Sequence, residues 1–280
     1  MTGAQLLARA TKALTAAGFP DPGRDARRLL AHVLKVPTGR LTLVLPEPVE
    51  TQVTVLYDVL INRRCERVPV SHLTGRRMFY GRDFQVSPAV LDPRPETETL
   101  IEVALSAPFQ TVLDLGTGSG CIVLTLLAEN VGARGLGIDL SAEALEVAFR
   151  NRTALGLEAR AGLKQGSWFD PLTGQGAVFD LIVSNPPYIA ASEMAELAPE
   201  VREYEPRLAL TDEDDGLSAY RLICAQAPRF LIAGGRLVFE IGATQGARVQ
   251  SLLETHGFQD VQIIQDLDAR DRVVSGTKPR

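Results

Sequence analysis

The sequence predicts an α/β protein: a mostly parallel sheet with helices on both faces, preceded by a small helical domain. From Thr111 to the end, short apolar runs alternate with stretches of helical periodicity, a pattern typical of parallel sheets. Up to about residue 70, apolar residues recur at helical spacing. The turn at 114–120 joins an apolar run to a helix and carries three glycines, so it has the backbone freedom that a ligand-binding loop needs.

The composition is that of an ordinary soluble globular protein. Its 280 residues suffice for one large domain and one small one, and 45% of them are hydrophobic and 22% charged. No apolar run approaches the roughly 20 residues that span a bilayer, and the N-terminus lacks the features of a secretory signal. We therefore expect a cytoplasmic protein. The net charge of −5 provides no overall attraction to a polyanion, so stable nucleic-acid binding is not expected.

Cysteine and histidine are too scattered in the sequence to suggest a metal site. The three cysteines, Cys65, Cys121 and Cys224, are odd in number and far apart, which also argues against a disulfide framework. The three histidines show no spacing typical of zinc ligands. We expect no metal, and we interpret the cysteines as small buried residues.

Residues 1–70 are expected to form the helical domain. A helical stripe that begins at Leu6 ends before Gly18, which suits a helix C-terminus. Asp21 and Pro22 have the residue types of an N-cap and a first helical position. A third stripe consists of Val53, Leu56, Leu60 and Ile61. Because the region has no nucleophile or glycine loop, we expect it to bind a partner or to support the other domain.

Residues 71–90 are expected to form a β-hairpin linker to a second domain at 91–280. Two strand-like pieces, 72–75 and 83–86, are separated by the turn residue Gly81. A short connection of this kind favours two strands that pair with each other.

A helix is expected next, with charged residues at its start. Arg94, Glu96 and Glu98 precede the apolar run at 100–105. Acidic side chains are favoured near a helix N-terminus by the helix dipole, so on one interpretation they simply stabilise the helix. On the other, the three charged residues help to shape a pocket. The residues alone leave the two interpretations equal.

The second domain is expected to contain seven strands, with helices between them. The strands are placed at 112–115, 136–139, 159–163, 180–183, 236–241, 261–265 and 272–275. The helices are placed at 119–130, 142–155, 216–232 and 245–256. In such sheets ligands bind at the carboxyl ends of the strands, near the point where the strand order reverses. The polar residues that follow the strands are therefore the candidate site.

The loop after the first of these strands has the composition of a cofactor-binding loop. Gly116, Gly118 and Gly120 alternate with Thr117 and Ser119. Glycine at every second position lets a nucleotide-like ligand approach the backbone, and the N-terminus of the following helix offers unpaired N–H groups. The spacing G-x-G-x-G departs from the dinucleotide fingerprint G-x-G-x-x-G, which counts against a nicotinamide cofactor.

Asp139 and Trp168 follow the second and third strands. Asp139 can accept hydrogen bonds from both hydroxyls of a ribose, or it can cap the next helix. Ser141 is equally suited to the cap, which favours a ligand-binding role for Asp139. The indole of Trp168, the only tryptophan of the sequence, can lie against an adenine or can pack in the core.

The fourth strand ends in Asn185-Pro186-Pro187-Tyr188. Neither proline can donate to a sheet or continue a helix, so the chain leaves the sheet at Asn185 with carbonyls that lack regular partners. The amide oxygen of Asn185, the carbonyl of Pro186 and the ring of Tyr188 would suit a planar group bearing an NH2. An Asn-Pro pair by itself more often indicates an ordinary turn. The glycine loop and Asp139 upstream change that balance.

Together these features resemble the class I S-adenosylmethionine-dependent methyltransferases, which have a Rossmann-like fold. The tetrapeptide 185–188 looks like the motif of members that methylate a planar amino or amide nitrogen. Nearly the whole chain resembles the protein glutamine N5-methyltransferases of the HemK/PrmC type, which have a helical domain, a hairpin linker and a seven-stranded catalytic domain. Further similar segments are 73–75, Phe84, 86–88, 93–98, 240–242, Gln245 and 271–276. The chain departs from the family at Asp92, where an aliphatic residue is common, and at Ser167, where Asp is common.

The resemblance implies S-adenosyl-L-methionine as the cofactor and S-adenosyl-L-homocysteine as its product. It implies cofactor contacts from the glycine loop, Asp139, Trp168 and Asn185. It implies substrate contacts from 185–188, with Asn185, Pro186 and Tyr188 as catalytic residues. The implied substrate is the Gln of a Gly-Gly-Gln loop in class 1 peptide chain release factors, methylated at its N5 amide nitrogen, with the helical domain docking on the factor. Such a modification belongs to translation termination.

Two other substrates share the motif: a ribosomal protein methylated on glutamine, and DNA methylated on adenine N6. The sequence shows no additional target-recognition region, and its acidic balance disfavours DNA. A binding protein that keeps the cofactor pocket but catalyses nothing is a further alternative, which the intact motif disfavours.

Overall fold

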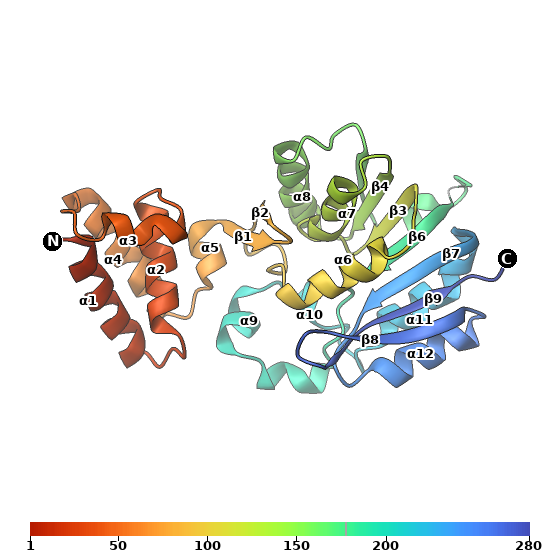
Figure 1. The fold of residues 1–280 in the computed structure, drawn as a ribbon. Helices are drawn as coiled ribbons and strands as arrows, with labels where there is room; N and C mark the ends of the chain where they lie inside the picture. Colours follow the sequence, from red (N-terminus) through yellow and green to blue (C-terminus); the bar gives the residue numbers. More distant parts are fainter. Residues whose placement is uncertain (177) are drawn as a thin grey trace. The chain divides into compact units, whose positions relative to one another are not determined.

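A computed structural model describes residues 1–176 and 178–280. Its contacts divide the chain into two units, one of Met1–Arg76 with Ala198–Tyr204 and one of Arg77–Leu197 with Glu205–Arg280. Figure 1 follows the chain through both. Across the described residues, every helix is too short or too polar to cross a membrane.

The first unit is a helical bundle with its own core. Its helices are α1 (Gly3–Ala16), α2 (Pro22–Val33), α3 (Leu41–Val44), α4 (Thr51–Cys65), α5 (Val70–Thr74) and α9 (Pro199–Tyr204). The predicted N-cap is confirmed, because the Asp21 side chain accepts a hydrogen bond from the Arg24 N–H at 3.2 Å. Within the core, the hydroxyl of buried Tyr57 donates to the Ala26 carbonyl at 2.9 Å, which joins α4 to α2.

Two expectations for this unit are wrong. Residues 72–75, expected as a strand, belong to α5 and to Gly75, which ends that helix at a φ of +68°. Val70 of the same helix packs in the bundle core, so burial against the other helices overrides a weak local preference for strand. Leu56, expected in the buried stripe of α4, is 49% exposed because Tyr57 occupies the inward position one residue later.

A segment far along the chain completes the bundle. Glu200 of α9 accepts a hydrogen bond from Arg67 at 3.2 Å, and the Tyr204 hydroxyl donates to the Glu66 carbonyl at 2.5 Å. The sequence analysis placed no element there. The segment Ala198–Tyr204, which follows the motif at 185–188, thus belongs to the helical unit, and from Glu205 the chain belongs to the second unit again.

The predicted hairpin is present. Strands β1 (Arg76–Phe79) and β2 (Arg82–Gln85) form a two-stranded sheet around a turn in which Gly81 has a φ of +72°. Phe79 and Phe84 are buried, with ring centroids 6.1 Å apart in an edge-to-face arrangement. Both rings belong to the same apolar cluster as Leu100, so this part of the hairpin is anchored in the core of the second unit.

The second unit is built on a seven-stranded sheet. Its strands are β3 (Thr111–Leu115), β4 (Arg134–Asp139), β5 (Ala161–Gln165), β6 (Phe179–Ser184), β7 (Leu231–Glu240), β8 (Gln259–Gln265) and β9 (Asp271–Thr277). They lie in the order β5-β4-β3-β6-β7-β9-β8. Strand β9 is antiparallel to both of its neighbours, and the four pairs from β5 to β7 are parallel. The predicted mostly parallel sheet is confirmed.

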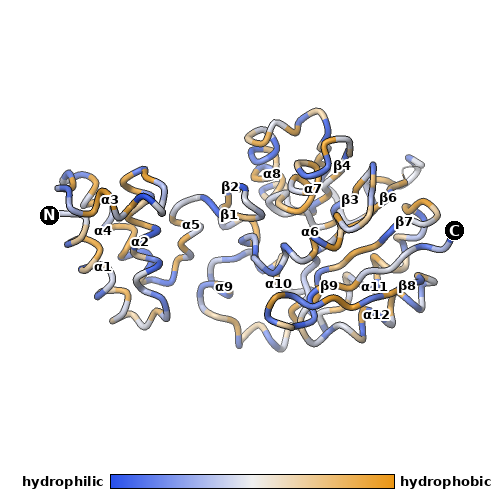
Figure 2. The backbone as a smooth tube through the Cα atoms, viewed as in Figure 1, coloured by the Kyte–Doolittle hydropathy of each residue, from blue (hydrophilic) through white to orange (hydrophobic). Residues whose placement is uncertain are grey.

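Helices cover both faces of this sheet (Figure 1). They are α6 (Glu98–Leu105), α7 (Cys121–Glu129), α8 (Ala142–Ala154), α11 (Ser218–Gln226) and α12 (Gly246–Thr255), besides the single turn α10 (Arg207–Leu210). Because successive strand residues point to opposite faces, Val112 and Val183 pack with α6 and α7, whereas Leu113 and Ile182 pack with α11 and α12. Figure 2 shows β7, near the middle of the sheet, as largely hydrophobic.

The helix expected at 216–232 is wrong at its C-terminal end. Helix α11 stops at Gln226, and Pro228, which has no N–H to donate, lies in the 3-10 turn that follows. The chain then enters β7 at Leu231, earlier than the expected 236. Strand β5 begins at Ala161, slightly later than expected.

The order of the strands reverses at β3. Strands β4 and β5 extend the sheet on one side of β3, and β6 and β7 extend it on the other. The carboxyl ends of β3, β4 and β6 are therefore neighbours, at the place where such sheets bind their ligands. The glycine loop, Asp139 and Asn185 follow these three ends.

Candidate active site

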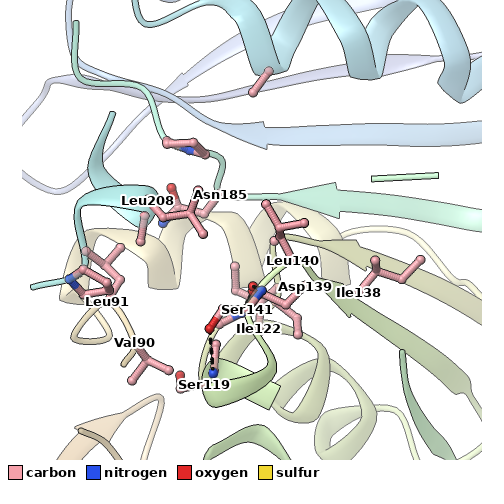
Figure 3. Close-up of a pocket in the computed structure, with 18 of the residues that line it drawn as sticks. Val90, Leu91, Ser119, Ile122, Ile138, Asp139, Leu140, Ser141, Asn185 and Leu208 are labelled. Atoms are coloured by element: carbon pink, nitrogen blue, oxygen red, sulfur yellow. Dashed lines mark hydrogen bonds between the residues drawn. The ribbon is translucent and has the colours of Figure 1, made fainter. Parts of the chain in front are cut away.

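A cavity of about 410 Å3 lies at this edge of the sheet. Its volume falls within the range of roughly 300–1,000 Å3 that is common for small-molecule sites. Figure 3 labels Asn185 beside Leu208, and Asp139 beside Ser141. The predicted site residues that line it are Gly116, Thr117, Gly118, Ser119, Asp139, Trp168, Asn185 and Pro187. Three other predicted residues, all within the described chain, lie outside the lining: Gly120, Pro186 and Tyr188.

The glycines of the loop serve different purposes. Gly118 has a φ of +54°, and a Cβ built there would meet nothing within 4 Å, although the residue lines the cavity. A side chain at that position would fill space that a ligand can use. Gly120 has a φ of +79°, and its Cβ would lie 2.9 Å from a methyl of Leu124. Gly120 is thus needed for the close packing of α7 onto the loop.

Asp114 supports the loop from inside the protein. Its buried carboxylate accepts hydrogen bonds from the Thr117 hydroxyl at 2.6 Å and from the Val123 N–H at 3.3 Å. Burial raises the pKa of Asp114 to about 7, although both of these hydrogen bonds favour the ionised form. The loop therefore rests on a carboxyl group that titrates near neutral pH.

This raised pKa predicts a pH dependence of stability for the protein without cofactor. The ordinary pKa is 3.8, so between pH 4 and pH 7 the folded chain keeps a proton on Asp114 that the unfolded chain has lost. Its contribution to the free energy of unfolding is therefore complete below pH 4 and is lost as the pH rises to 7. Urea unfolding should show that the free energy of unfolding is lower at pH 8 than at pH 5. This decrease should be smaller in Asp114→Asn than in wild type by up to about 3 kcal/mol.

Burial likewise raises the pKa of Glu205 and of Glu240 to about 7, so the variant retains part of the pH dependence. The comparison with wild type isolates the share of Asp114. An identical decrease in the two proteins would show that Asp114 is ionised throughout this range.

Asp139 lies at the end of β4 with both carboxylate oxygens in contact with backbone N–H groups. One oxygen accepts from Gly118 at 2.7 Å and the other from Ser141 at 2.9 Å. Ser141 caps α8 by accepting from the Ala144 N–H at 3.0 Å, so the cap is Ser141, as the sequence suggested. Asp139 therefore holds the glycine loop against β4 while it lines the cavity.

Trp168 combines the two roles considered for it. Its side chain lines the cavity and also packs against the apolar core beneath the sheet. The indole lies 3.8 Å from where a Cβ of Gly116 would be, so the ring borders the glycine loop. The backbone of Trp168 has a φ of +45°, a conformation that costs energy for a residue with a side chain and that orients this ring.

The motif after β6 is anchored from both sides. The Ser184 hydroxyl donates to the Leu115 carbonyl at 2.7 Å, which joins the ends of β6 and β3. The Gln245 side chain donates to the Tyr188 carbonyl at 2.9 Å. Between these anchors Asn185 lines the cavity, and none of the described residues makes a hydrogen bond with its side chain. Its amide is available to a ligand.

The neighbours of Asn185 are more enclosed. Pro186 is buried, and the Tyr188 ring packs against the apolar core. Burial raises the pKa of Tyr188 to about 12, and the charge of Glu240 acts in the same direction, so the phenol stays protonated at neutral pH.

The charged residues before α6 have different roles: one shapes the cavity and another has a structural contact. Arg94 lines the cavity, and its Nη2 atom donates to both carboxylate oxygens of Glu205, at 2.6 and 2.7 Å. Glu98 instead accepts a hydrogen bond from the Tyr80 N–H at 2.8 Å, which fastens the hairpin to α6. The start of α6 has no side-chain cap. A pocket role thus suits Arg94 and a structural role suits Glu98.

Comparison with known proteins shows what kind of protein this is. A model of the methyltransferase domain matches residues 108–257, and a model of the PrmC N-terminal domain matches residues 5–75. The release factor glutamine methyltransferase of Cereibacter sphaeroides is 51% identical over 279 residues, which cover 100% of this chain and 99% of the relative. The chain belongs to the release factor glutamine methyltransferase family.

Other comparisons agree with this assignment. The release factor glutamine methyltransferase of Rhodospirillum rubrum is 44% identical over 96% of this chain and 82% of its own length. A methyltransferase from Pyrococcus furiosus of known structure has a TM-score of 0.55 at 16% identity, over 72% of this chain and 91% of the other, which shows the common fold. The predicted family and the class I methyltransferase fold are confirmed, and the chain is a methyltransferase.

Parts of the cavity of this methyltransferase were missed by the sequence analysis. They come from the stretch between the hairpin and α6 and from the chain after the 185–188 motif: Ala89, Val90, Leu91, Pro206, Leu208, Ala209, Thr211, Asp212, Glu213, Ser218, Ala219 and Leu222. These stretches have no glycine pattern or strand end to mark them. One feature of the sequence does point to parts of this lining. The two residues that depart from the family pattern, Asp92 and Ser167, both line the cavity.

The cysteines also differ in part from the expectation. Cys224 is buried as predicted, whereas Cys121 is half-buried and lines the cavity, because it opens α7 directly after the glycine loop. Cys65 is half-buried in the helical unit. Within the described residues, no three His, Cys, Asp or Glu side chains are grouped so that they could hold a metal ion.

Proposed function

We propose that this methyltransferase uses S-adenosyl-L-methionine to methylate the N5 amide nitrogen of the Gln in the Gly-Gly-Gln loop of class 1 release factors. The observation that carries the proposal is the placement of Asn185. Its unengaged amide lines the same cavity as the glycine loop and Asp139, so one cavity contains groups for a cofactor and for a planar amide. The names of the relatives support a release factor as the substrate protein.

The lining of the cavity offers groups that suit this cofactor. The open space at Gly118 admits a ligand against the backbone, Asp139 offers carboxylate oxygens to a ribose, and the Trp168 ring offers an aromatic face to an adenine. When bound, S-adenosyl-L-methionine supplies a methyl group on a sulfonium, an already activated leaving group. A strong general base is therefore not required before methyl transfer.

The protein's contribution to the reaction is mainly to position the substrate amide. The nitrogen of a glutamine amide is a poor nucleophile because its lone pair is delocalised into the carbonyl. Asn185 and the Pro186 carbonyl accept hydrogen bonds from the two N–H groups and thereby draw the nitrogen toward tetrahedral geometry. Pro187, which lines the cavity beside Asn185, borders the amide plane. The proton leaves to solvent after the transfer.

The test is transfer of labelled methyl groups to purified release factor and to its loop Gln→Ala variant. Incorporation into the first and not into the second supports both the reaction and its site. Equal incorporation into both would overturn the glutamine assignment. The same assay on ribosomal protein and on DNA distinguishes the alternatives, since labelling of DNA alone would exclude a protein substrate.

The helical unit is proposed to dock on the release factor through an apolar face of α4. Tyr57 and Ile61 turn one face of this helix into the core, yet Val55, Leu56 and Val59 are about half exposed on the other. Exposed apolar side chains that lie together mark contact surfaces. Met1 and Leu43 of this unit are exposed as well, but they are single positions, whereas α4 presents three exposed apolar side chains on one helix face, so we assign the docking to this face.

Introduction of negative charge on this apolar face should weaken substrate binding. The double variant Val55→Glu, Val59→Glu is expected to raise KM for the release factor about tenfold, the effect of losing central apolar contacts in an interface. The kcat and the cofactor affinity should stay unchanged. Val131→Glu, at an exposed apolar position of the second unit, is the matched control. An unaltered KM in the double variant would place the docking surface elsewhere.

A further inference from the structure

Asn151, on α8, is a buried asparagine that the proposed reaction does not use. It is 1% exposed, and its side chain has every polar group paired. The Oδ1 atom accepts from the Gln85 N–H at 2.7 Å, and Nδ2 donates to the Gln85 carbonyl at 3.0 Å and to the Ser119 carbonyl at 2.8 Å. One side chain thus joins the last residue of β2 to the glycine loop.

The two segments that Asn151 joins form different walls of the cavity. Ser119 belongs to the glycine loop. Shortly after Gln85 the chain turns at 87–90, where Val90 N–H donates to the Ser87 carbonyl at 3.1 Å, and then lines the cavity. Figure 3 shows Val90 and Leu91 on the side of the cavity away from Ile138.

The wall that contains Val90 is held at its far end by Arg77, whose Nε donates to the Pro93 carbonyl at 3.0 Å and whose guanidinium pairs with Asp92 at 3.5 Å. Val86 and Val90 form a small cluster with Ala144 and Val147, both on α8, separate from the two large cores of the unit. So small an apolar cluster stabilises a segment weakly. The Arg77 contacts tie this wall to the hairpin, whereas the three hydrogen bonds of Asn151 connect its start directly to the glycine loop.

We infer that Asn151 is a positioning residue for the cofactor: it holds the 86–91 wall and the glycine loop at the separation that the cofactor requires. The inference rests on the proposed function in that it takes S-adenosyl-L-methionine as the ligand of the cavity. If Asn151 served folding alone, its replacement would reduce the stability of the protein, but the folded molecules would bind the cofactor with unchanged affinity. A positioning role changes KM and Kd for the cofactor, but it leaves kcat at saturating cofactor nearly unchanged.

The first test is Asn151→Ala, measured by calorimetric binding of S-adenosyl-L-homocysteine and by steady-state methyl transfer. Loss of the amide removes the Nδ2 donor from the carbonyls of Gln85 and Ser119, so Kd and the cofactor KM should rise at least about tenfold, with kcat changed less than about threefold. Asn130→Ala is the matched control. Asn130 also ties a helix end to a backbone carbonyl, that of Phe109 at 2.8 Å, but unlike the contacts of Asn151 this one does not reach a segment that lines the cavity.

Asn151→Asp provides a second test that preserves the volume of the side chain. Its carboxylate still accepts from the Gln85 N–H but faces the Ser119 carbonyl without a proton, so affinity should fall at pH 8. At pH 6 a protonated carboxyl group can donate to that carbonyl, and part of the affinity should return relative to wild type. Because protonation also relieves any destabilisation by the buried charge, circular dichroism must show the variant folded at both pH values; recovery in a protein that is folded throughout then reports the restored hydrogen bond.

The outcomes separate the inference from the proposed function. If wild type does not bind S-adenosyl-L-homocysteine, the proposed function fails. If wild type binds it and Asn151→Ala and Asn151→Asp bind it within twofold of wild type, the positioning role is overturned. An equal increase of Kd in Asn130→Ala would also overturn it, because the effect would then follow from any lost helix anchor.

Discussion

Asn185→Ala is expected to lower kcat by about 10³-fold, the loss found when one preorganised polar group is removed from a reaction centre, while Kd for S-adenosyl-L-homocysteine changes little. The Asn185 amide lines the cavity without a hydrogen bond to any described side chain or backbone group, so its removal disturbs no internal contact. The glycine loop and Asp139 keep their own hydrogen bonds. Single-turnover methyl transfer and calorimetry measure the two quantities separately.

Asn185→Asp is the matched comparison for this variant. A carboxylate keeps two acceptor oxygens in nearly the same volume, so it should retain more activity than alanine. If Asn185→Ala lost cofactor affinity in proportion to kcat, Asn185 would serve the cofactor site and its assignment to the substrate amide would be wrong.

Gly216→Ala is expected to destabilise the protein and to inactivate it by displacing the motif at 185–188. Gly216 has a φ of +76°, and a Cβ there would lie 2.2 Å from the Tyr188 carbonyl oxygen and 3.0 Å from Gln245 Nε2. The Gln245 side chain donates to that carbonyl, so the new methyl group must displace both. Backbone strain and steric clash together should cost more than about 3 kcal/mol, and methyl transfer should fall with the displaced motif.

Gly156→Ala separates backbone strain from clash. Gly156 has a similar φ of +67°, but a Cβ there would meet nothing within 4 Å, so only the left-handed conformation is penalised, at about 1–2 kcal/mol. Urea unfolding and methyl-transfer rates of the two variants give the comparison. Equal losses of stability, or full activity in Gly216→Ala, would show that the motif tolerates movement of Tyr188.

Residues that follow strand ends could be placed from the sequence because their positions depend on local rules. A buried apolar run ends at a recognisable residue, and parallel strands bring their carboxyl ends to one edge. The sequence therefore predicts that Gly118, Asp139 and Asn185 are neighbours, and all three line one cavity. The capping of α8 by Ser141 follows from equally local chemistry.

Residues whose position depends on distant partners could not be placed in this way. Asn151 occupies an ordinary helical position, and its contact with Gln85 joins residues 66 positions apart. The stretch that contains Leu208 has no periodic pattern, yet it closes part of the cavity. Residues 72–75 looked extended, but the neighbouring helices of the bundle determined their conformation.

The sequence by itself determined the class of fold, the family and the strand-end residues of the site, because hydrophobic periodicity, turn chemistry and motif spacing are properties of short segments. Only the tertiary structure decided which side chains hold those segments together: Asp139 on the Gly118 N–H, Gln245 on the Tyr188 carbonyl, and Asn151 between the glycine loop and the hairpin. The physical reason is that a buried polar group is satisfied by whichever partner the folded chain brings within reach, and that partner has no fixed distance along the sequence.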